Sequence, residues 1–229
     1  MSVDPDDIPQ PSKGDIAHGI AKAAISSIPL AGGAAVEIFQ MIVAPPIERR
    51  RNAWMESVAE RIRELQGRGI DSAALSENEN FITAVMSATQ IALRTHSVEK
   101  LNALRAAISN IAVGRSPSDT RQHIFLELID VLAPEALRVL KFAQAPGGSP
   151  DTMMGSLRTV LIGKIPQAEQ DEELYHVLWR DLASRGLLNT DSLMTTMSGA
   201  GLAQKRTTEI GDQLLAFITD PPLEPTPQP

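Results

Sequence analysis

The sequence predicts an all-α protein, with a multi-helix N-terminal domain and a small winged-helix-like C-terminal domain that contains minor β structure. Only 3% of the 229 residues are aromatic, and Ala, Leu and Ile supply most of the apolar residues. This composition favours close-packed helices over sheets, which are rich in aromatic and β-branched residues. Apolar residues also recur at helical spacing along most of the chain, and Gly or Pro separates the segments.

The expected helices follow one another through short turns. The apolar runs over 15–28 and 34–44, divided by Pro29 and Gly32-Gly33, predict a helical hairpin. Further helices are expected to begin near these residues: Pro46, Asp71, Asn80, Ser97, Ser118 and Pro134. The one that begins at Pro46 should be long and amphipathic, with an apolar stripe made of Ile47, Trp54, Val58, Ile62 and Leu65.

A run of helix-breaking residues at 146–150, Pro-Gly-Gly-Ser-Pro, predicts a linker between two domains. The helical domain is then expected over 15–145 and the C-terminal domain over 151–219. The acidic residues 1–14 and the proline-rich residues 220–229 are expected to be a disordered leader and tail.

The C-terminal segment carries a pattern similar to the second half of winged-helix domains. Helices are expected from Met153 to Leu161 and from Gln170 to Arg185, followed by an extended Leu187-Leu188, a polar loop and a last helix over 208–219. In a DNA-binding winged helix, the helix before the strand enters the major groove. Between residues 168 and 186, however, five acidic residues stand against two basic ones, so phosphate would be repelled and nucleic-acid binding is disfavoured.

Composition also limits the chemistry. The chain has no cysteine, which excludes disulfides and thiolate catalysis and favours the cytoplasm. Its four histidines are scattered, with no His-Glu-x-x-His pair, so no metal site is expected. No P-loop, nucleophile elbow or converging acid and base pair occurs. The prediction is a protein that is not an enzyme, with no cofactor, no catalytic residues and no evident small-molecule substrate. An active site would require side chains distant in sequence to converge in the fold.

The most unusual segment is 23–47, which has Glu37 as its one charged residue and is followed by Glu48 and three arginines. It is interpreted either as a buried hairpin of a soluble core or as a hairpin that lies on or inserts into a membrane when triggered. Its prolines and glycines disfavour a single spanning helix. The expected membrane or partner contacts are Ile28, Leu30, Gly32, Gly33, Val36, Glu37, Phe39, Met41, Ile42, Val43, Arg49, Arg50 and Arg51.

Two further stretches carry a family resemblance. These are the residues from Glu79-Asn80-Phe81 to Leu104-Arg105, and Phe125-Leu126-Glu127-Leu128-Ile129-Asp130 with Pro134-Glu135 after it. They resemble a group of uncharacterised bacterial helical proteins and, more distantly, the abortive-infection alpha proteins of antiphage defence. The resemblance implies an all-α protein in a bacterial defence setting, and it carries no catalytic residues over.

The leading functional hypothesis is a non-enzymatic bacterial defence or stress protein. It would act by protein contact or self-association, or by conditional membrane perturbation through the apolar hairpin, from the cytoplasm or the periphery of the inner membrane. One alternative is a soluble adaptor that binds a protein partner through the winged-helix-like domain. A DNA-binding transcriptional regulator is a second alternative, which the charge of residues 168–186 opposes.

Overall fold

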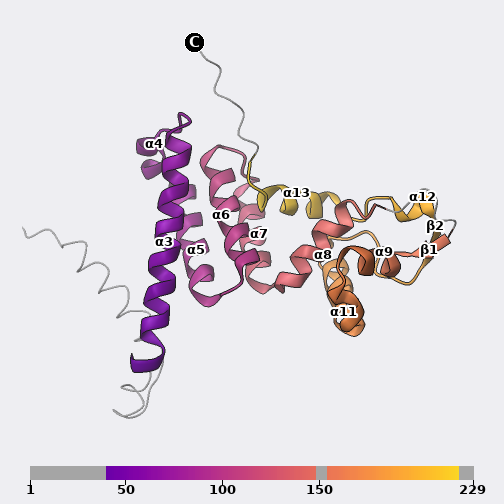
Figure 1. Cartoon of the computed structure of the whole chain (residues 1–229). Helices are drawn as coiled ribbons and strands as arrows, with labels where there is room; N and C mark the ends of the chain where they lie inside the picture. Colours follow the sequence, from indigo (N-terminus) through magenta and orange to yellow (C-terminus); the bar gives the residue numbers. More distant parts are fainter. Residues whose placement is uncertain (1–39, 148–153, 222–229) are drawn as a thin grey trace, which may run out of the picture. The chain divides into compact units, whose positions relative to one another are not determined.

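The computed structural model describes residues 40–147 and 154–221. The contacts of the chain divide into two compact units, Met1–Glu48 and Arg49–Pro229. The hairpin expected over 15–28 and 34–44 lies almost entirely outside the described residues, as do the leader and nearly all of the tail. The second unit is therefore the one whose architecture can be followed (Figure 1).

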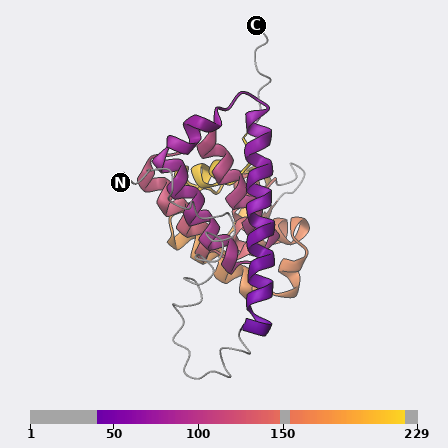
Figure 2. The ribbon, with the colours of Figure 1, turned by 90° about the vertical axis from the view of Figure 1, so that its left-hand side faces the viewer.

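The described residues are mainly helical, with one small two-stranded sheet, so the predicted helical class is confirmed. The longest of the described helices, α3 (Ala44–Gln66), can be followed along its length in Figure 2. The elements in chain order are α3 (Ala44–Gln66), α4 (Ser72–Glu77), α5 (Glu79–Arg94), α6 (Val98–Ala112), α7 (Asp119–Val131), α8 (Pro134–Gln144), β1 (Met154–Ser156), α9 (Leu157–Lys164), α10 (Gln167–Gln170), α11 (Glu172–Ser184), β2 (Thr196–Ser198), α12 (Gly199–Leu202) and α13 (Glu209–Phe217).

Local capping explains where several of these helices begin. The side chains of Asp71 and Ser97 accept hydrogen bonds from the backbone N–H groups two or three residues later, which satisfies donors that a helix start leaves open. Asn78 does the same for α5, two residues before the start expected at Asn80. Pro134 occupies the first turn of α8, where its missing N–H costs nothing.

The expected stripe of α3 is largely confirmed. Trp54, Val58 and Leu65 are buried, and Ile62 packs against the core while half-buried. The indole Nε1 of Trp54 donates a hydrogen bond to Oγ1 of Thr89 on α5 at 3.0 Å. This directional bond sets the position of α3 along α5, which non-directional apolar contacts alone define less sharply.

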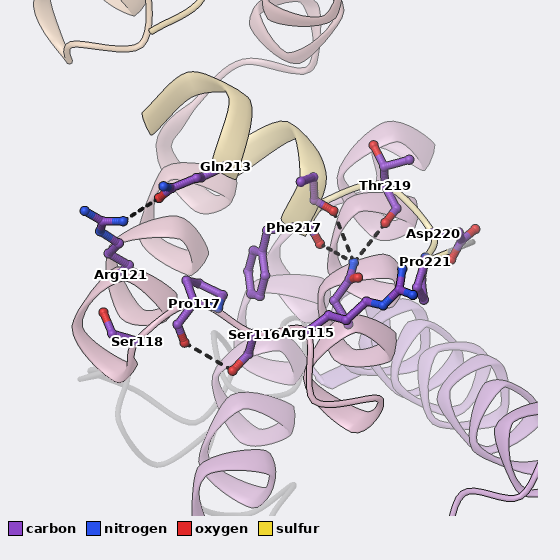
Figure 3. Close-up of a pocket in the computed structure, with 12 residues that line it drawn as sticks. Arg115, Ser116, Pro117, Ser118, Arg121, Gln213, Phe217, Thr219, Asp220 and Pro221 are labelled. Carbon is purple, nitrogen blue, oxygen red and sulfur yellow. Dashed lines mark hydrogen bonds between the residues drawn. The ribbon is translucent and has the colours of Figure 1, made fainter. Parts of the chain in front are cut away.

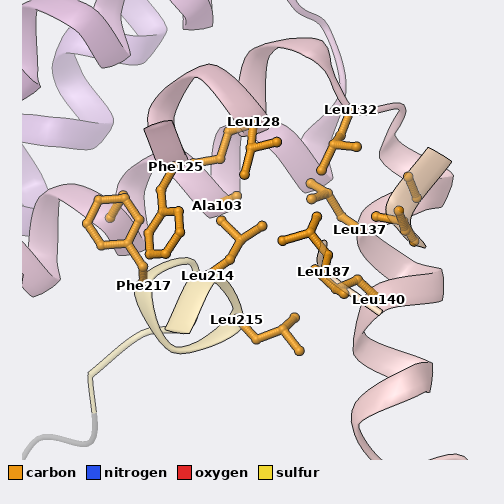
Figure 4. Packing of buried hydrophobic residues seen from close by; sticks show 14 of the residues in the cluster. Ala103, Phe125, Leu128, Leu132, Leu137, Leu140, Leu187, Leu214, Leu215 and Phe217 are labelled. Carbon is orange, nitrogen blue, oxygen red and sulfur yellow. The ribbon is translucent and has the colours of Figure 1, made fainter. Parts of the chain in front are cut away.

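One hydrophobic core runs through the second unit. Buried residues from Trp54 on α3 to Phe217 on α13 belong to the same cluster. Figure 4 shows part of this core, with Leu214 and Leu215 of α13 among side chains of other helices. The rings of Phe125 and Phe217 lie with their centroids 5.7 Å apart and their planes tilted by 49°. Helix α13 therefore joins the helices on which the expected N-terminal domain is built.

This shared core contains residues from both sides of 146–150, the segment expected to be a linker. Helix α8 lies before that segment, yet it packs against α11 and α13, which follow it. The backbone N–H of Arg206 donates to the carbonyl of Ala143 at 2.8 Å, and Trp179 meets Phe142 edge to face. The division between compact units falls at Glu48 and Arg49, not at 146–150.

The helix expected from Met153 to Leu161 is partly wrong. Residues 154–156 instead form β1, which pairs antiparallel with β2 in the register Met154 to Ser198. Helix α9 begins only at Leu157, after Ser156 accepts a hydrogen bond from the N–H of Thr159. The polar loop after Leu188 thus contains a strand and the short α12, because pairing with β1 satisfies backbone groups that the local sequence leaves open.

The extended segment expected at Leu187-Leu188 is observed. Both leucines are buried, and Leu188 forms an isolated antiparallel bridge with Thr207. Gly186 turns the chain out of α11 with φ of 73°, a conformation that favours glycine. The carbonyl of Leu187 then approaches Gly211 of α13 so closely that a Cβ on that glycine would lie 2.3 Å from it.

Across residues 40–147 and 154–221, we find no helix that combines the length and the apolar character required to cross a bilayer.

Candidate functional site

A cavity of about 490 Å³ lies between the turn that joins α6 to α7 and the C-terminal end of α13. Figure 3 shows it from close by, with Arg121 and Gln213 at one side and Thr219, Asp220 and Pro221 at the other. Its lining residues are Asn110, Arg115, Ser116, Pro117, Ser118, Arg121, Gln213, Ala216, Phe217, Thr219, Asp220 and Pro221. Polar groups line its rim, and the ring of Phe217 contributes an apolar wall.

Asn110 closes the base of this cavity. Its side chain is 4% exposed, and Nδ2 donates to the carbonyls of Thr219 at 2.8 Å and Phe217 at 3.0 Å. Nδ2 also lies 3.3 Å from the carbonyl of Ala216 and 3.0 Å from that of Ala106 in its own helix. The last carbonyls of a helix have no partner within the helix. Asn110 supplies that partner for α13 from the last turn of α6.

One side of the cavity is held by Arg121 of α7, whose Nη1 donates to Oε1 of Gln213 on α13 at 2.7 Å. At the other side, Asp220 accepts a hydrogen bond from Arg61 at 2.8 Å. The carboxylate of Asp220 is thus already engaged with a guanidinium. The hydrogen-bonding groups named here are therefore held in fixed positions around the cavity by partners within the protein.

Arg61 lines a second cavity of about 330 Å³, which shares Asp220 with the first. Its side chain is 15% exposed and makes three contacts, with Oγ of Ser109 at 2.7 Å, with Glu64 at 2.8 Å and with Asp220 at 2.8 Å. Charge-assisted bonds of a planar guanidinium are directional. Arg61 therefore ties α3 to α6 and to the segment that follows α13.

A third cavity of about 300 Å³ shares Ser57 and Arg105 with the second cavity. The indole of Trp54 contributes to its wall. Arg50, one of the arginines expected as a contact residue, lines it as well.

A hydrogen-bonded carboxylate orders the chain between α12 and α13. Asp212 accepts from Thr207 Oγ1 at 2.6 Å, from Gln144 Nε2 at 3.2 Å and from Lys205 Nζ. Partial burial raises the pKa of Asp212, but the hydrogen bonds from Lys205, Thr207 and Gln144 outweigh burial and hold that pKa below its ordinary value. Asp212 is therefore a structural carboxylate of the C-terminal segment, joined to the end of α8.

Helix α11 presents apolar side chains to solvent. It buries Tyr175, Leu178, Trp179 and Leu182 in the core. Away from that face, Leu174 is 40% and Val177 54% exposed. At its start Arg158 of α9 binds Glu172, and this hydrogen bond lowers the pKa of Glu172.

The predicted contact residues are distributed unevenly. Ile28, Leu30, Gly32, Gly33, Val36, Glu37 and Phe39 lie outside the described residues. Met41 and Ile42 are 78% and 64% exposed, and Val43 is half-buried. Arg49 and Arg50 are exposed on α3, whereas Arg51 is half-buried. Of this set, Arg50 lines one of the three cavities.

Sequence reasoning missed Asn110, Arg61 and Arg105. Asn110 interrupts the apolar stripe of α6 beside Ala107 and Ile111, and that interruption is a signal that a buried polar contact was required. Arg61 and Arg105 carried no comparable signal, because arginines on amphipathic helices are ordinarily solvated.

Among the residues that the structure describes, no group of three or more histidine, aspartate or glutamate side chains is placed to hold a metal ion. Comparisons of this chain with protein-family models, with curated proteins and with solved structures found no match.

Proposed function

We propose that this chain works by binding another protein, as an adaptor or effector without chemistry of its own. The observation that carries this proposal is the pair of exposed apolar side chains Leu174 and Val177 on α11. An exposed apolar side chain is common in isolation, but two that are adjacent on a rigid helix offer a small anchor for a partner. Tyr175 and Trp179 fix that helix on its opposite face.

The charge around this anchor indicates the chemistry of the partner. Glu169 and Glu173 are exposed near the start of α11, and residues 168–186 are acidic on balance. An apolar surface with a basic rim would complement it, whereas a nucleic-acid backbone would be repelled. The antiparallel β1 and β2 pair, and the bridge of Leu188 with Thr207 after α11, support a winged-helix-like arrangement used for protein contact.

The test is affinity capture with three full-length chains: the wild type, the double variant Leu174→Asp, Val177→Asp, and Met86→Asp. Met86 is 61% exposed on α5 and is a matched control, because it too places a charge on an exposed apolar site. We expect the wild type and Met86→Asp to retain the same stoichiometric partner and the α11 variant to lose it. Equal retention by all three chains, or a partner lost by the control as well, contradicts the proposal.

A second candidate is contact with a membrane, favoured by the exposure of Met41 and Ile42 just before α3. Apolar side chains next to basic ones bind anionic bilayers. Leakage of anionic liposomes that is lost in Ile42→Asp and kept in Met86→Asp would support this candidate. Absence of leakage with the wild-type chain would reject it.

The resemblance to bacterial helical proteins and abortive-infection proteins supports a defence or stress setting for either activity. Growth and membrane potential measured in a bacterium with and without phage challenge test that setting. Protection without depolarisation is expected for the contact-based effector, and protection with rapid depolarisation for the membrane candidate. If the chain gives no protection against phage, the defence setting is contradicted. Binding to a partner protein is then judged from the affinity capture alone.

A further inference from the structure

The third cavity differs from its neighbours in charge. Two arginines, Arg50 of α3 and Arg105 of α6, line it together with His96, and none of its described lining residues is a carboxylate. The second cavity, by contrast, contains Glu60, Glu64 and Asp220. The chain as a whole has a net charge of −7, whereas the charged side chains that line this cavity are positive.

The two guanidinium groups keep capacity for an anion. Arg105 donates through Nη2 to Oδ1 of Asn102, a neutral amide. Within the described part of the chain, neither Arg50 nor Arg105 forms an ion pair with a carboxylate. Guanidinium groups present several N–H donors in a planar fork that matches phosphate oxygens.

A hydroxyl adds a further donor. Oγ1 of Thr95 accepts from the N–H of Ser97 at 3.1 Å, and its own hydrogen has no acceptor among the described residues. Ser57 also lines the cavity, but its hydroxyl already donates to the carbonyl of Trp54 at 2.8 Å. The donors available to a ligand therefore come from the arginines, Thr95 and the imidazole of His96.

The rest of the wall is apolar and rigid. Ala92 is buried and Leu101 half-buried, and the indole of Trp54 is 4% exposed. Nε1 of Trp54 is held by Thr89 Oγ1, which in turn donates to the carbonyl of Val85 at 2.7 Å. The indole is thus fixed before any ligand arrives, which lowers the entropic cost of binding.

We propose that this cavity binds a small phosphate monoester that carries an aromatic or other apolar group. The phosphate would lie against Arg50, Arg105 and the Thr95 hydroxyl, and the apolar group against Trp54, Ala92 and Leu101. The cavity volume of about 300 Å³ is at the lower end of the range for ligand-binding cavities, so the ligand should be small. A dianion is favoured over a carboxylate because two guanidinium groups can share its charge. This site is independent of the α11 surface.

The experiment uses phenyl phosphate as the probe and Trp54 as the reporter. The chain has two tryptophans, so the full-length variant Trp179→Phe leaves Trp54 as the source of indole fluorescence. Titration with phenyl phosphate should give a saturable change, and Arg105→Gln in the same background should weaken binding by about tenfold or more, as expected for loss of a charge-assisted contact. Arg63→Gln is the matched control, because Arg63 is exposed on α3 and lines none of the three cavities.

Two further arms distinguish the parts of the ligand. Inorganic phosphate tests the anion alone and phenol the ring alone, and each should bind at least about tenfold more weakly than phenyl phosphate. If Trp179→Phe does not fold, ³¹P resonance broadening of phenyl phosphate by the wild-type chain, compared with Arg105→Gln, replaces fluorescence. No saturable response in the millimolar range, equal binding by Arg105→Gln, or equal loss in Arg63→Gln overturns the proposal.

Discussion

The side-chain amide of Asn110 donates a hydrogen bond to the main-chain carbonyl of Phe217 at 3.0 Å, across 107 positions of sequence. A buried amide in α6 therefore terminates α13, the last helix of the chain. A buried carbonyl without a hydrogen-bond partner costs free energy. Loss of this bond should therefore destabilise the fold by more than an exposed hydrogen bond would.

Replacement of Asn110 by alanine should lower the free energy of unfolding by about 1–3 kcal/mol, because the carbonyls at the end of α13 lose their donor. Urea denaturation followed by circular dichroism measures this loss. Asn52→Ala is the control: Asn52 is exposed on α3, and its replacement should change stability by less than about 0.5 kcal/mol. A loss of equal size in both variants would contradict the role of Asn110.

Two glycines in helices should respond in opposite directions to alanine. In Gly211→Ala the new Cβ meets the backbone carbonyl oxygen of Leu187 at 2.3 Å, so α13 must move and stability should fall by about 1–3 kcal/mol. In Gly163→Ala nothing lies within 4 Å, and the gain in helix propensity should raise stability by about 0.5–1 kcal/mol. Thermal unfolding of the two variants measures both changes, and a neutral Gly211→Ala would show that α13 is free to shift.

Asp212 should make stability depend on pH in the acidic range. Its pKa in the folded chain lies below the ordinary value, so its contribution is complete above the unfolded pKa of about 4 and is lost as pH falls through the folded pKa. The difference in unfolding free energy between the wild type and Asp212→Asn should thus be largest near pH 6 and shrink on acidification. Urea unfolding at several pH values from 6 to 3 measures it.

Asp191→Asn serves as the control for this pH series, because Asp191 is an exposed residue of the loop before β2. Its replacement should leave a difference from the wild type that is small at every pH. A gap for Asp212→Asn that stays constant with pH would mean that the hydrogen bonds from Thr207 and Gln144 do not depend on the charge of the carboxylate.

The shared core predicts that the N- and C-terminal parts of the second unit unfold together. Trp54 on α3 and Trp179 on α11 report on the two parts, and each indole is held by a hydrogen bond of 3.0 Å. Urea unfolding of Trp179→Phe and Trp54→Phe, followed by the remaining indole, should show fluorescence and circular dichroism curves that coincide within each variant. Indole and dichroism transitions that separate would instead support independent domains on either side of 146–150.

Part of the fold could be predicted from local signals. Asp71 and Ser97 cap helices as their side chains allow, and Pro134 starts one. The stripe of α3 and the buried Leu187-Leu188 likewise followed from apolar spacing. These features depend on residues within one or two turns of each other, and that range is what a sequence pattern encodes.

The cavities could not be predicted in the same way. Arg50, Trp54, His96 and Arg105 come from α3, from the segment after α5 and from α6, and the third cavity exists because helix packing brings them together. The residues of β1 were expected to be helical. The strand was missed because its partner lies 42 positions away along the chain. A pairing over that distance leaves no local period to detect.

The sequence by itself determined the helical class, the starts of several helices and the lack of cysteine chemistry, since these depend on composition and on neighbours along the chain. Tertiary structure decided that Asn110 ends α13, that Asp212 joins α8 to the C-terminal segment, and that arginines surround an apolar cavity beside Trp54. The physical reason is that hydrogen bonds and charge clusters of this kind form between segments that only packing brings within reach.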